Sequence, residues 1–253
     1  MALTTNLVIW QWNCISFPKR KAALQQFIKS SADQPAVILL QETLTADPTL
    51  RAYRTEADHR MGTRGIATLI SKKYAYVRHE VRPDLKDEHI LIELIPNSQL
   101  KQSIFILNVY STPKNTRTTF QVLFQRASKI AGDHMLIIAG DFNAQHNDFG
   151  YRGSSRKGTA LVSQINTHRL TLLTDPNSPT RVGNSVTGDS APDLTMVRNA
   201  GQPTWTNLRE NLGSDHYIIQ TVISVSTNKI RNYRITDWDR FRELRRTMPI
   251  TTH

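Results

Sequence analysis

Cysteine is almost absent from this sequence. The 253 residues contain a single cysteine, Cys14, so no disulfide can form within the chain. A chain without a disulfide framework is typical of a reducing compartment, the cytosol or the nucleus. Apolar residues surround Cys14, which favours a small buried side chain. Because no neighbour in the sequence is placed to lower its pKa, we do not expect a thiol nucleophile.

Long hydrophobic runs are also missing. No stretch approaches the ~20 apolar residues that a membrane-spanning helix needs, and no signal peptide is recognisable. Acidic residues are few, since 21 Asp and Glu stand against 32 Lys and Arg, which gives a net charge of +11. Such an excess favours polyanionic partners, nucleic acid before anionic membrane. We therefore expect a nucleic-acid partner and no membrane association.

What the chain does contain is a series of short apolar runs rich in β-branched and aromatic residues, typical of strands. They occupy residues 7–12, 36–40, 66–70, 89–95, 104–110, 135–139, 170–173, 194–197 and 217–223. Apolar residues at helical spacing predict helices over 20–31, 116–131 and 158–168. Many strands and few helices, mixed rather than strictly alternating, predict an α/β fold with at least one mixed sheet.

The most informative stretch is Gly140-Asp141-Phe142-Asn143-Ala144, which directly follows the apolar run 135–139. Side chains alternate along a strand, so Asp141 and Asn143 are expected on one side of its tip. A carboxylate that accepts a proton from water, beside an amide that donates to a phosphate, suits phosphodiester hydrolysis. The ends of the other runs carry Asn13, Gln41-Glu42-Thr43, Asn108-Val109-Tyr110, Asp193 and Ser214-Asp215-His216.

Phosphodiester cleavage needs a set of functional groups of this kind. It uses a carboxylate for a metal, a base for water, donors to the phosphate and a group that stabilises developing charge. Each residue alone is a weak signal, because single polar residues at strand ends are usually solvated or half-buried. Their recurrence at the ends of six runs predicts one hydrolytic site.

The motifs also occur in a characteristic order. They are WNCISF (12–17), QET (41–43), NVY (108–110), GDFNA (140–144), PDLT (192–195) and SDH (214–216). This order resembles the exonuclease–endonuclease–phosphatase superfamily, which includes deoxyribonuclease I and the apurinic/apyrimidinic (abasic-site) endonucleases. Within it, GDFNAQHNDFGY (140–151) is similar to the endonuclease domain of non-LTR (LINE-type) retrotransposons. The resemblance implies a four-layer α/β/β/α sandwich of two packed mixed sheets flanked by helices, with the site at one edge.

The resemblance also implies metal chemistry. Glu42 would be the principal ligand of a divalent cation, Mg²⁺ with Mn²⁺ as a substitute, and Asn13 and Asp215 would help to hold it. Mg²⁺ is a hard cation that prefers such oxygen ligands. Abasic-site relatives carry a carboxylate two residues after the first Asn, where this chain has Ile15. We therefore expect Glu42 to be the main ligand of the metal and the metal to bind weakly.

The remaining catalytic roles follow from the same resemblance. Asp141 is expected to activate the attacking water, and Asn143 to position water or phosphate. His216, oriented by Asp193, would stabilise charge on the phosphoryl oxygens, since a paired carboxylate raises the basicity of an imidazole. Tyr110 would contact the scissile phosphate. The implied product is a nick with a 3′-hydroxyl.

Residues at the rim are expected to contact DNA. In relatives a hairpin near residues 178–191 enters the groove, so Thr180 and Arg181 are predicted to touch DNA and 182–191 to tune the sequence preference. His146 is predicted either to contact DNA or to pack. The other expected DNA contacts are Tyr110, Asn115 and Ser214, with phosphate contacts from Lys72, Lys73, Lys114, Arg152, Arg156 and Lys157.

We expect residues 1–225 to form the endonuclease domain and 226–253 a basic tail. Residues 229–246 carry seven basic and three acidic side chains, and 237–241 is a candidate helix start. ITDWDRFRE (235–243) resembles the segment that leads toward a reverse transcriptase, as in a piece excised from a longer polypeptide. By resemblance, the partners are double-stranded DNA, the reverse transcriptase region and element RNA, and the isolated domain would be a monomer that acts in the nucleus after cytoplasmic synthesis.

Three functions are consistent with the sequence. The first is a Mg²⁺-dependent DNA endonuclease that nicks its target for target-primed reverse transcription. The second is another phosphoesterase of this fold, such as an abasic-site repair endonuclease, an inositol-polyphosphate phosphatase or a sphingomyelinase. The Trp-Cys-Asp-Arg signature of the phosphatases is missing, and no membrane segment supports a sphingomyelinase. The third is a catalytically inactive DNA-binding module, against which the intact set of polar residues argues.

Overall fold

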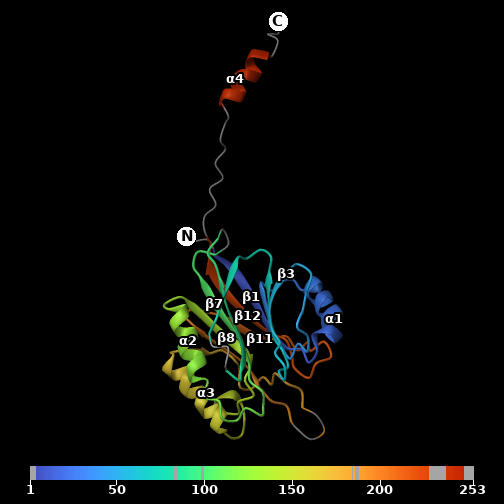
Figure 1. The fold of residues 1–253 in the computed structure, drawn as a ribbon, viewed down its shortest axis with the longest axis vertical. Coiled ribbons are helices and arrows are strands. Elements are labelled where there is room, and N and C mark those ends of the chain that lie inside the picture. Colours follow the sequence, from blue (N-terminus) through green and yellow to red (C-terminus); the bar gives the residue numbers. More distant parts are fainter. Residues whose placement is uncertain are drawn as a thin grey trace.

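Two six-stranded mixed sheets pack face to face in this computed structural model, which describes residues 4–81, 85–97, 100–183, 185, 188–227 and 238–247 (Figure 1). The first sheet has the order β11 (Thr204–Asn207), β12 (Ile219–Ser226), β1 (Thr4–Asn13), β2 (Val37–Gln41), β4 (Ile66–Ser71), β3 (Tyr53–Asp58). The second has the order β5 (Tyr76–His79), β6 (Glu88–Leu94), β7 (Ile104–Tyr110), β8 (Met135–Asp141), β10 (Asp193–Arg198), β9 (Thr171–Leu172).

Helices cover the outer faces of both sheets (Figure 1). On the first sheet, α1 (Phe17–Ser30) buries Leu24 and Ile28 against the strands. On the second, α2 (Gln121–Ala131) and α3 (Arg156–Thr167) bury their apolar faces in a separate cluster. A third cluster of aliphatic side chains fills the space between the sheets. The predicted four-layer α/β/β/α sandwich is therefore confirmed.

Buried amides join the two sheets near one edge. Asn108 on β7 donates from Nδ2 to the carbonyl of Ala67 on β4 at 2.9 Å. Its Oδ1 accepts from Gln41 Nε2 on β2 at 2.7 Å. Because a buried polar group is costly unless it is hydrogen-bonded, these amides favour one relative placement of the sheets.

Strand direction brings the polar strand ends to that same edge. The parallel strands β7 and β8 end there together, with Tyr110 opposite Asp141, and the antiparallel β10 begins there, with Asp193 opposite Asp141. In the other sheet the parallel strands β1 and β2 end with Asn13 opposite Gln41. Five strands thus deliver functional candidates to one edge of the sandwich.

The structure corrects several predicted boundaries. Helix α1 begins earlier than expected, at Phe17, and α2 begins at Gln121 rather than at 116. Strands β3, β5 and β11 were not predicted, and all three lie at sheet edges. Edge strands are half-exposed and rich in polar residues, so they lack the continuous apolar runs that reveal central strands.

The basic tail expected over 226–253 stays a prediction, because the structure describes only part of it. A helix, α4, spans Trp238–Thr247, close to the predicted helix start, and the exposed Trp238 opens it. The linker predicted before it falls on 228–237, outside the described residues. In the part of the chain that the structure describes, we find no helix with the length and apolarity required to cross a membrane.

Candidate active site

Asp141 lies at the centre of the site because of the glycine before it. The backbone of β8 passes so close to β7 that a Cβ on Gly140 would lie 1.9 Å from the carbonyl oxygen of Val109. Only glycine, which lacks that atom, permits this approach. The strand therefore presents Asp141 between Tyr110 and Asp193 on the neighbouring strands.

The carboxylate of Asp141 is buried and fully hydrogen-bonded. Its Oδ2 accepts from Asn13 Nδ2 at 2.9 Å, and its Oδ1 accepts from Asn143 Nδ2 at 2.7 Å. Burial, reinforced by the nearby Asp193 carboxylate, raises the pKa of Asp141 to about 7, although His216 and Asn13 act to lower it. A base with a pKa near the working pH is well matched to accepting a proton from water.

Asn143 meets Asp141 by a different route from the one predicted. Strand β8 ends at Asp141, and Asn143 has a left-handed backbone with φ of 46°. This turn folds the amide back onto Asp141, and Nδ2 also lies 3.3 Å from the carbonyl oxygen of Ser111. The two residues are neighbours as expected, but a turn rather than strand alternation brings them together.

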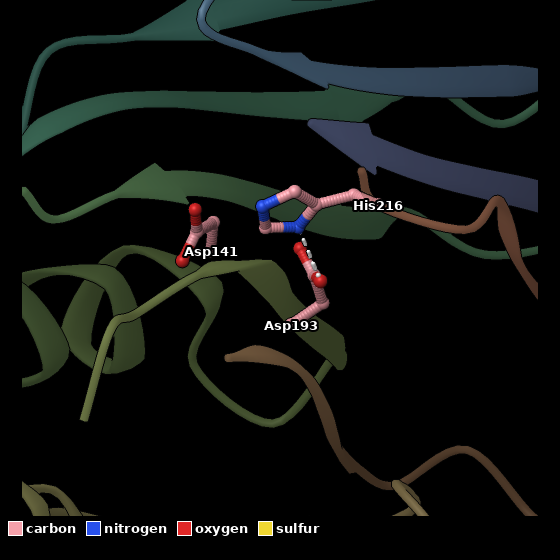
Figure 2. A group of neighbouring side chains, drawn as sticks. All are labelled: Asp141, Asp193 and His216. Atoms are coloured by element: carbon pink, nitrogen blue, oxygen red, sulfur yellow. Dashed lines mark hydrogen bonds and ion pairs between the residues drawn. The ribbon is translucent and has the colours of Figure 1, made fainter. Parts of the chain in front are cut away.

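His216 and Asp193 form a buried pair beside Asp141. Figure 2 shows the ring between the two carboxylates, with Nδ1 bonded to Asp193 Oδ2 at 2.7 Å and the other nitrogen turned toward Asp141. Burial lowers the pKa of His216, but the Asp193 charge and hydrogen bond outweigh it and raise the pKa to about 9. The imidazole is therefore cationic at neutral pH, as a group that stabilises negative charge must be.

Thr180 and Ser214 support this pair instead of facing DNA. Thr180 is fully buried, and its Oγ1 donates to Asp193 Oδ2 at 2.7 Å. Ser214 is also buried, donates to the carbonyl of Asn13 at 2.7 Å and accepts from the His216 backbone N–H at 3.2 Å. The predicted DNA contacts of both side chains do not fit this placement, because neither hydroxyl reaches the surface.

Glu42 lies on the more exposed side of the site. It follows β2 with a left-handed φ of 52°, and 13% of its side chain is exposed. The hydroxyl of Tyr110 donates to its Oε1 at 2.8 Å, and Nε of Arg64 donates to its Oε2 at 2.7 Å. Arg64 was not predicted, because nothing in the sequence distinguishes it from other surface arginines.

Asp215 is similarly paired with an arginine. Nε of Arg181 donates to its Oδ2 at 2.8 Å, and 33% of the Asp215 side chain is exposed. Its Oδ1 lies 3.7 Å from Nε2 of His216 and has no hydrogen-bond partner among the described residues. Arg181, predicted to touch DNA, therefore bonds a carboxylate of the site and leaves 36% of its own side chain exposed.

One group of side chains in the described part of the chain is placed to hold a metal ion, and a second set is predicted from the sequence. Ligand atoms of Asp141, Asp193 and His216 lie within 4.8 Å of one another. A protonated imidazole cannot coordinate a metal, however, so this group suits proton transfer better. The predicted set of Glu42, Asn13 and Asp215 offers oxygen ligands that suit Mg²⁺, including the unbonded Oδ1 of Asp215.

Three further predicted DNA contacts have other partners. Asn115 donates to the buried Asp87 at 2.8 Å. His146 accepts from the backbone N–H of Asp148 at 3.2 Å, at the start of the short helix Asn147–Phe149, and packs on Phe149. Of the two roles predicted for His146, DNA contact or packing, this placement matches packing. Lys157 is buried, and its ammonium group bonds the backbone carbonyls of Ser111 and Thr112, so its contact with phosphate stays a prediction.

A cavity of about 560 Å³ opens beside Asn143. Its lining includes Asn143, Tyr151, Arg156, Lys157 and Arg181. Part of the predicted specificity loop borders it, although residues 184, 186 and 187 of that loop lie outside the described residues. The site therefore adjoins a polar and basic hollow.

Comparisons with known proteins agree with this fold. A family model described as "Endonuclease-reverse transcriptase" matches residues 104–220, a span that includes Tyr110, Asp141, Asp193 and His216. No curated protein sequence matches the chain. The resemblance inferred from the motifs, to an endonuclease of the exonuclease–endonuclease–phosphatase superfamily, is thus confirmed by the family model and the fold.

Solved structures show the same fold at low sequence identity. The endonuclease domain of TRAS1, a telomere-specific non-LTR retrotransposon, is 16% identical with a TM-score of 0.69, over 89% of this chain and 100% of that one. The AP endonuclease LMAP from Leishmania major is 15% identical with a TM-score of 0.69, over 86% and 87%. An endonuclease/exonuclease/phosphatase family protein from Bacteroides thetaiotaomicron is 13% identical with a TM-score of 0.62, over 88% and 99%.

Proposed function

We propose that this chain is a divalent-metal-dependent DNA endonuclease that nicks one strand of a duplex and leaves a 3′-hydroxyl for target-primed reverse transcription. One observation carries the proposal: a buried carboxylate and a cationic imidazole lie side by side at the sheet edge (Figure 2). The family match to endonuclease–reverse transcriptases supports a hydrolytic role. The composition, with a net charge of +11, supports a polyanionic substrate.

Asp141 is the proposed base. Near neutral pH a carboxyl group with a pKa of about 7 is partly ionised, so it can accept a proton from water and release it afterwards. The amides of Asn13 and Asn143 fix its orientation from both sides. We expect a water between Asp141 and the scissile phosphorus to be the nucleophile.

His216 is the proposed charge stabiliser. Asp193 holds its Nδ1–H, and Thr180 in turn holds Asp193, so the ring has one orientation. Its Nε2–H, which lies 3.7 Å from Asp215 Oδ1, would donate to a phosphoryl oxygen where negative charge develops. Tyr110, through its hydroxyl on Glu42, lies at the same edge and is proposed to contact the scissile phosphate.

Glu42, Asn13 and Asp215 would hold the cation, Mg²⁺ with Mn²⁺ as a substitute. When bound, the cation would neutralise charge on the phosphate oxygens. Arg64 and Arg181 now neutralise the two carboxylates of this set, and both arginines are substantially exposed. They are free to turn toward DNA phosphates once a cation replaces them.

The biological setting is also part of the proposal. We place double-stranded DNA as the substrate, the reverse transcriptase region of the same polyprotein and element RNA as partners, and the nucleus as the place of action. The isolated domain is proposed to be a monomer. Binding should weaken steeply with salt, because each neutralised phosphate adds about 0.9 to the log–log slope.

Nicking of supercoiled plasmid tests the activity. Purified protein should convert it to relaxed circles with Mg²⁺, and neither an EDTA control nor Asp141→Asn should do so. A DNA polymerase should extend the nicks without prior end repair, which identifies the 3′-hydroxyl. Failure to nick with any divalent metal, while DNA is still bound, would favour an inactive binding module. Preference for an abasic-site duplex over intact DNA would favour a repair endonuclease.

A further inference from the structure

Lys157 is a buried cation that the proposed mechanism does not use. It is the second residue of α3, and only 3% of it is exposed. A buried ammonium is costly unless it is hydrogen-bonded or paired. The residue that follows it, Gly158, holds the start of α3 in place. Gly158 packs so closely on the backbone after Ala144 that a Cβ there would lie 1.8 Å from the carbonyl oxygen of Gln145.

The ammonium group binds the chain directly after β7. Nζ lies 3.3 Å from the carbonyl oxygen of Ser111 and 3.2 Å from that of Thr112. It also lies 5.8 Å from the centroid of the Phe120 ring, within the range of a cation–π contact. Burial lowers the pKa of Lys157 to about 8, while Asp87 and Asp141 act to raise it, so the group is mostly cationic at neutral pH.

The carbonyl of Ser111 links Lys157 to the proposed base. The same oxygen lies 3.3 Å from Nδ2 of Asn143, whose amide bonds Asp141 at 2.7 Å. The backbone N–H of Ser111 also donates to the Asp141 carbonyl at 2.9 Å. Lys157 is therefore three hydrogen bonds away from the Asp141 carboxylate, through Ser111 and Asn143.

A buried carboxylate holds the other side of this segment. Asp87, which is 4% exposed, accepts from the side chains of Ser111, Asn115 and Thr118 at 2.5, 2.8 and 2.6 Å. Asp87 thus binds the side chains of the 111–118 segment, and Lys157 binds its carbonyls. Opposite buried charges on the two sides leave this segment little freedom.

We propose that Lys157 is a positioning residue for the nuclease reaction, which holds the Ser111 carbonyl so that Asn143 keeps Asp141 aligned with the attacking water. The inference rests on the proposed function. The buried ammonium is then expected to affect the rate of the chemical step and not the affinity for DNA. The neighbouring Arg156 is exposed and lines the same cavity, so it provides the contrasting case.

The test compares Lys157→Ala and Lys157→Met with Arg156→Ala. Single-turnover nicking at saturating enzyme gives the rate of cleavage, and binding of intact duplex in EDTA gives affinity. The two Lys157 variants should lose rate on the order of 10²-fold, as expected when reacting groups are misaligned, and should bind DNA like the wild type. Arg156→Ala should weaken DNA binding and make the binding less dependent on salt, because one phosphate contact is lost.

Added ethylammonium distinguishes an ammonium role from general unfolding. Because the truncated side chain of Lys157→Ala leaves space beside the cavity, ethylammonium should restore part of the rate, and ethanol should not. The wild-type rate in Lys157→Met would overturn the inference, as would a rate loss that only follows the unfolded fraction and is not rescued. If the wild type itself fails to nick, the proposed function fails, which is a separate outcome.

Discussion

The two sheets contribute unlike halves to the active site. From the second sheet come Asp141 and Asp193, which are buried and lie within 4.8 Å of His216, and Asp193 is hydrogen-bonded to that imidazole. From the first sheet comes Glu42, which is partly exposed, and the neighbouring loop brings Asp215, which is 33% exposed. The carboxylates of this second half are bonded to the exposed arginines Arg64 and Arg181.

Burial explains the difference in chemistry. In the buried half, desolvation and neighbouring charges shift the pKa values of Asp141 and His216 toward neutral pH or beyond it, which suits proton transfer and charge stabilisation. In the other half, each carboxylate is paired with an arginine whose side chain is partly exposed, and ion pairs of this kind are weak enough for a cation to replace the arginine. We therefore propose that one half handles protons and the other handles the cation.

The largest effect is expected from Asp141→Asn. This change keeps the shape of the side chain but removes the proton acceptor, so nicking should fall on the order of 10³-fold, within the range for a general base. Binding of intact duplex, measured by fluorescence anisotropy, should be retained. Asp148→Asn, at an exposed carboxylate, is the matched control. Parallel loss of binding and nicking would show that Asp141 is structural.

His216→Ala should have the next largest effect. Loss of the cationic donor should lower the nicking rate about 10²-fold, as for other groups that stabilise transition-state charge. Single-turnover rates compared with His134→Ala, at an exposed imidazole, provide the measurement and control. An unchanged rate in His216→Ala would remove this residue from the proposed mechanism.

His216 also predicts how stability depends on pH. Its pKa rises from 6.5 to about 9 on folding, so its stabilising contribution is full below pH 6.5 and is lost as the pH rises through 9. Urea unfolding between pH 6.5 and 9 in EDTA should show wild-type stability falling with pH. His216→Gln should show a shallower fall, and an identical slope in the variant would contradict the assignment.

Thr180→Val should have a moderate effect, because the Thr180 hydroxyl acts through its hydrogen bond to Asp193. Loss of a hydrogen bond to a charged group costs roughly 1.5–3 kcal/mol, so a rate loss of about 10-fold is expected as Asp193 and the ring lose orientation. DNA binding should be unchanged, which separates this role from the predicted DNA contact. Thr171→Val, at an exposed threonine on β9, is the control. A loss of DNA binding without a loss of cleavage rate would instead support the prediction that Thr180 contacts DNA.

Arg64→Met should have the smallest effect. Without the guanidinium that pairs with Glu42, a cation meets less competition, so the Mg²⁺ concentration for half-maximal nicking should fall by about 3-fold, in line with the modest energies of exposed ion pairs. A Mg²⁺ titration beside Arg126→Met, at an exposed arginine of α2, measures this. A higher Mg²⁺ requirement would indicate that Arg64 supports the metal site.

The sequence predicted the central strands and the strand ends of the site well. Runs such as 104–110 and 135–139 are buried on both faces, and such strands are continuously apolar. Edge strands such as Tyr53–Asp58 were missed because their exposed face carries charged and polar residues. Gly140 and Asp141 could be assigned to the end of a strand because a glycine and a polar residue directly follow a buried apolar run.

Tertiary partners could not be predicted from the sequence. Thr180 lies in a loop rich in turn residues, and only the fold brings its hydroxyl to Asp193. In the sequence Lys157 resembles a surface cation beside Arg156, whereas the fold buries it against the carbonyls of Ser111 and Thr112. Arg64 reaches Glu42 across the two neighbouring strands β2 and β4, a contact between residues 22 positions apart in the sequence. Such pairings depend on topology, which local patterns do not encode.

The most direct test of this division is a metal titration of nicking by Glu42→Gln and Asp141→Asn. A weakened ligand can be offset by mass action, whereas a missing base cannot. We predict that high Mg²⁺ or Mn²⁺ restores much of the activity of Glu42→Gln and none of that of Asp141→Asn. Recovery of Asp141→Asn at high metal, with Glu42→Gln inactive at every concentration, would contradict it.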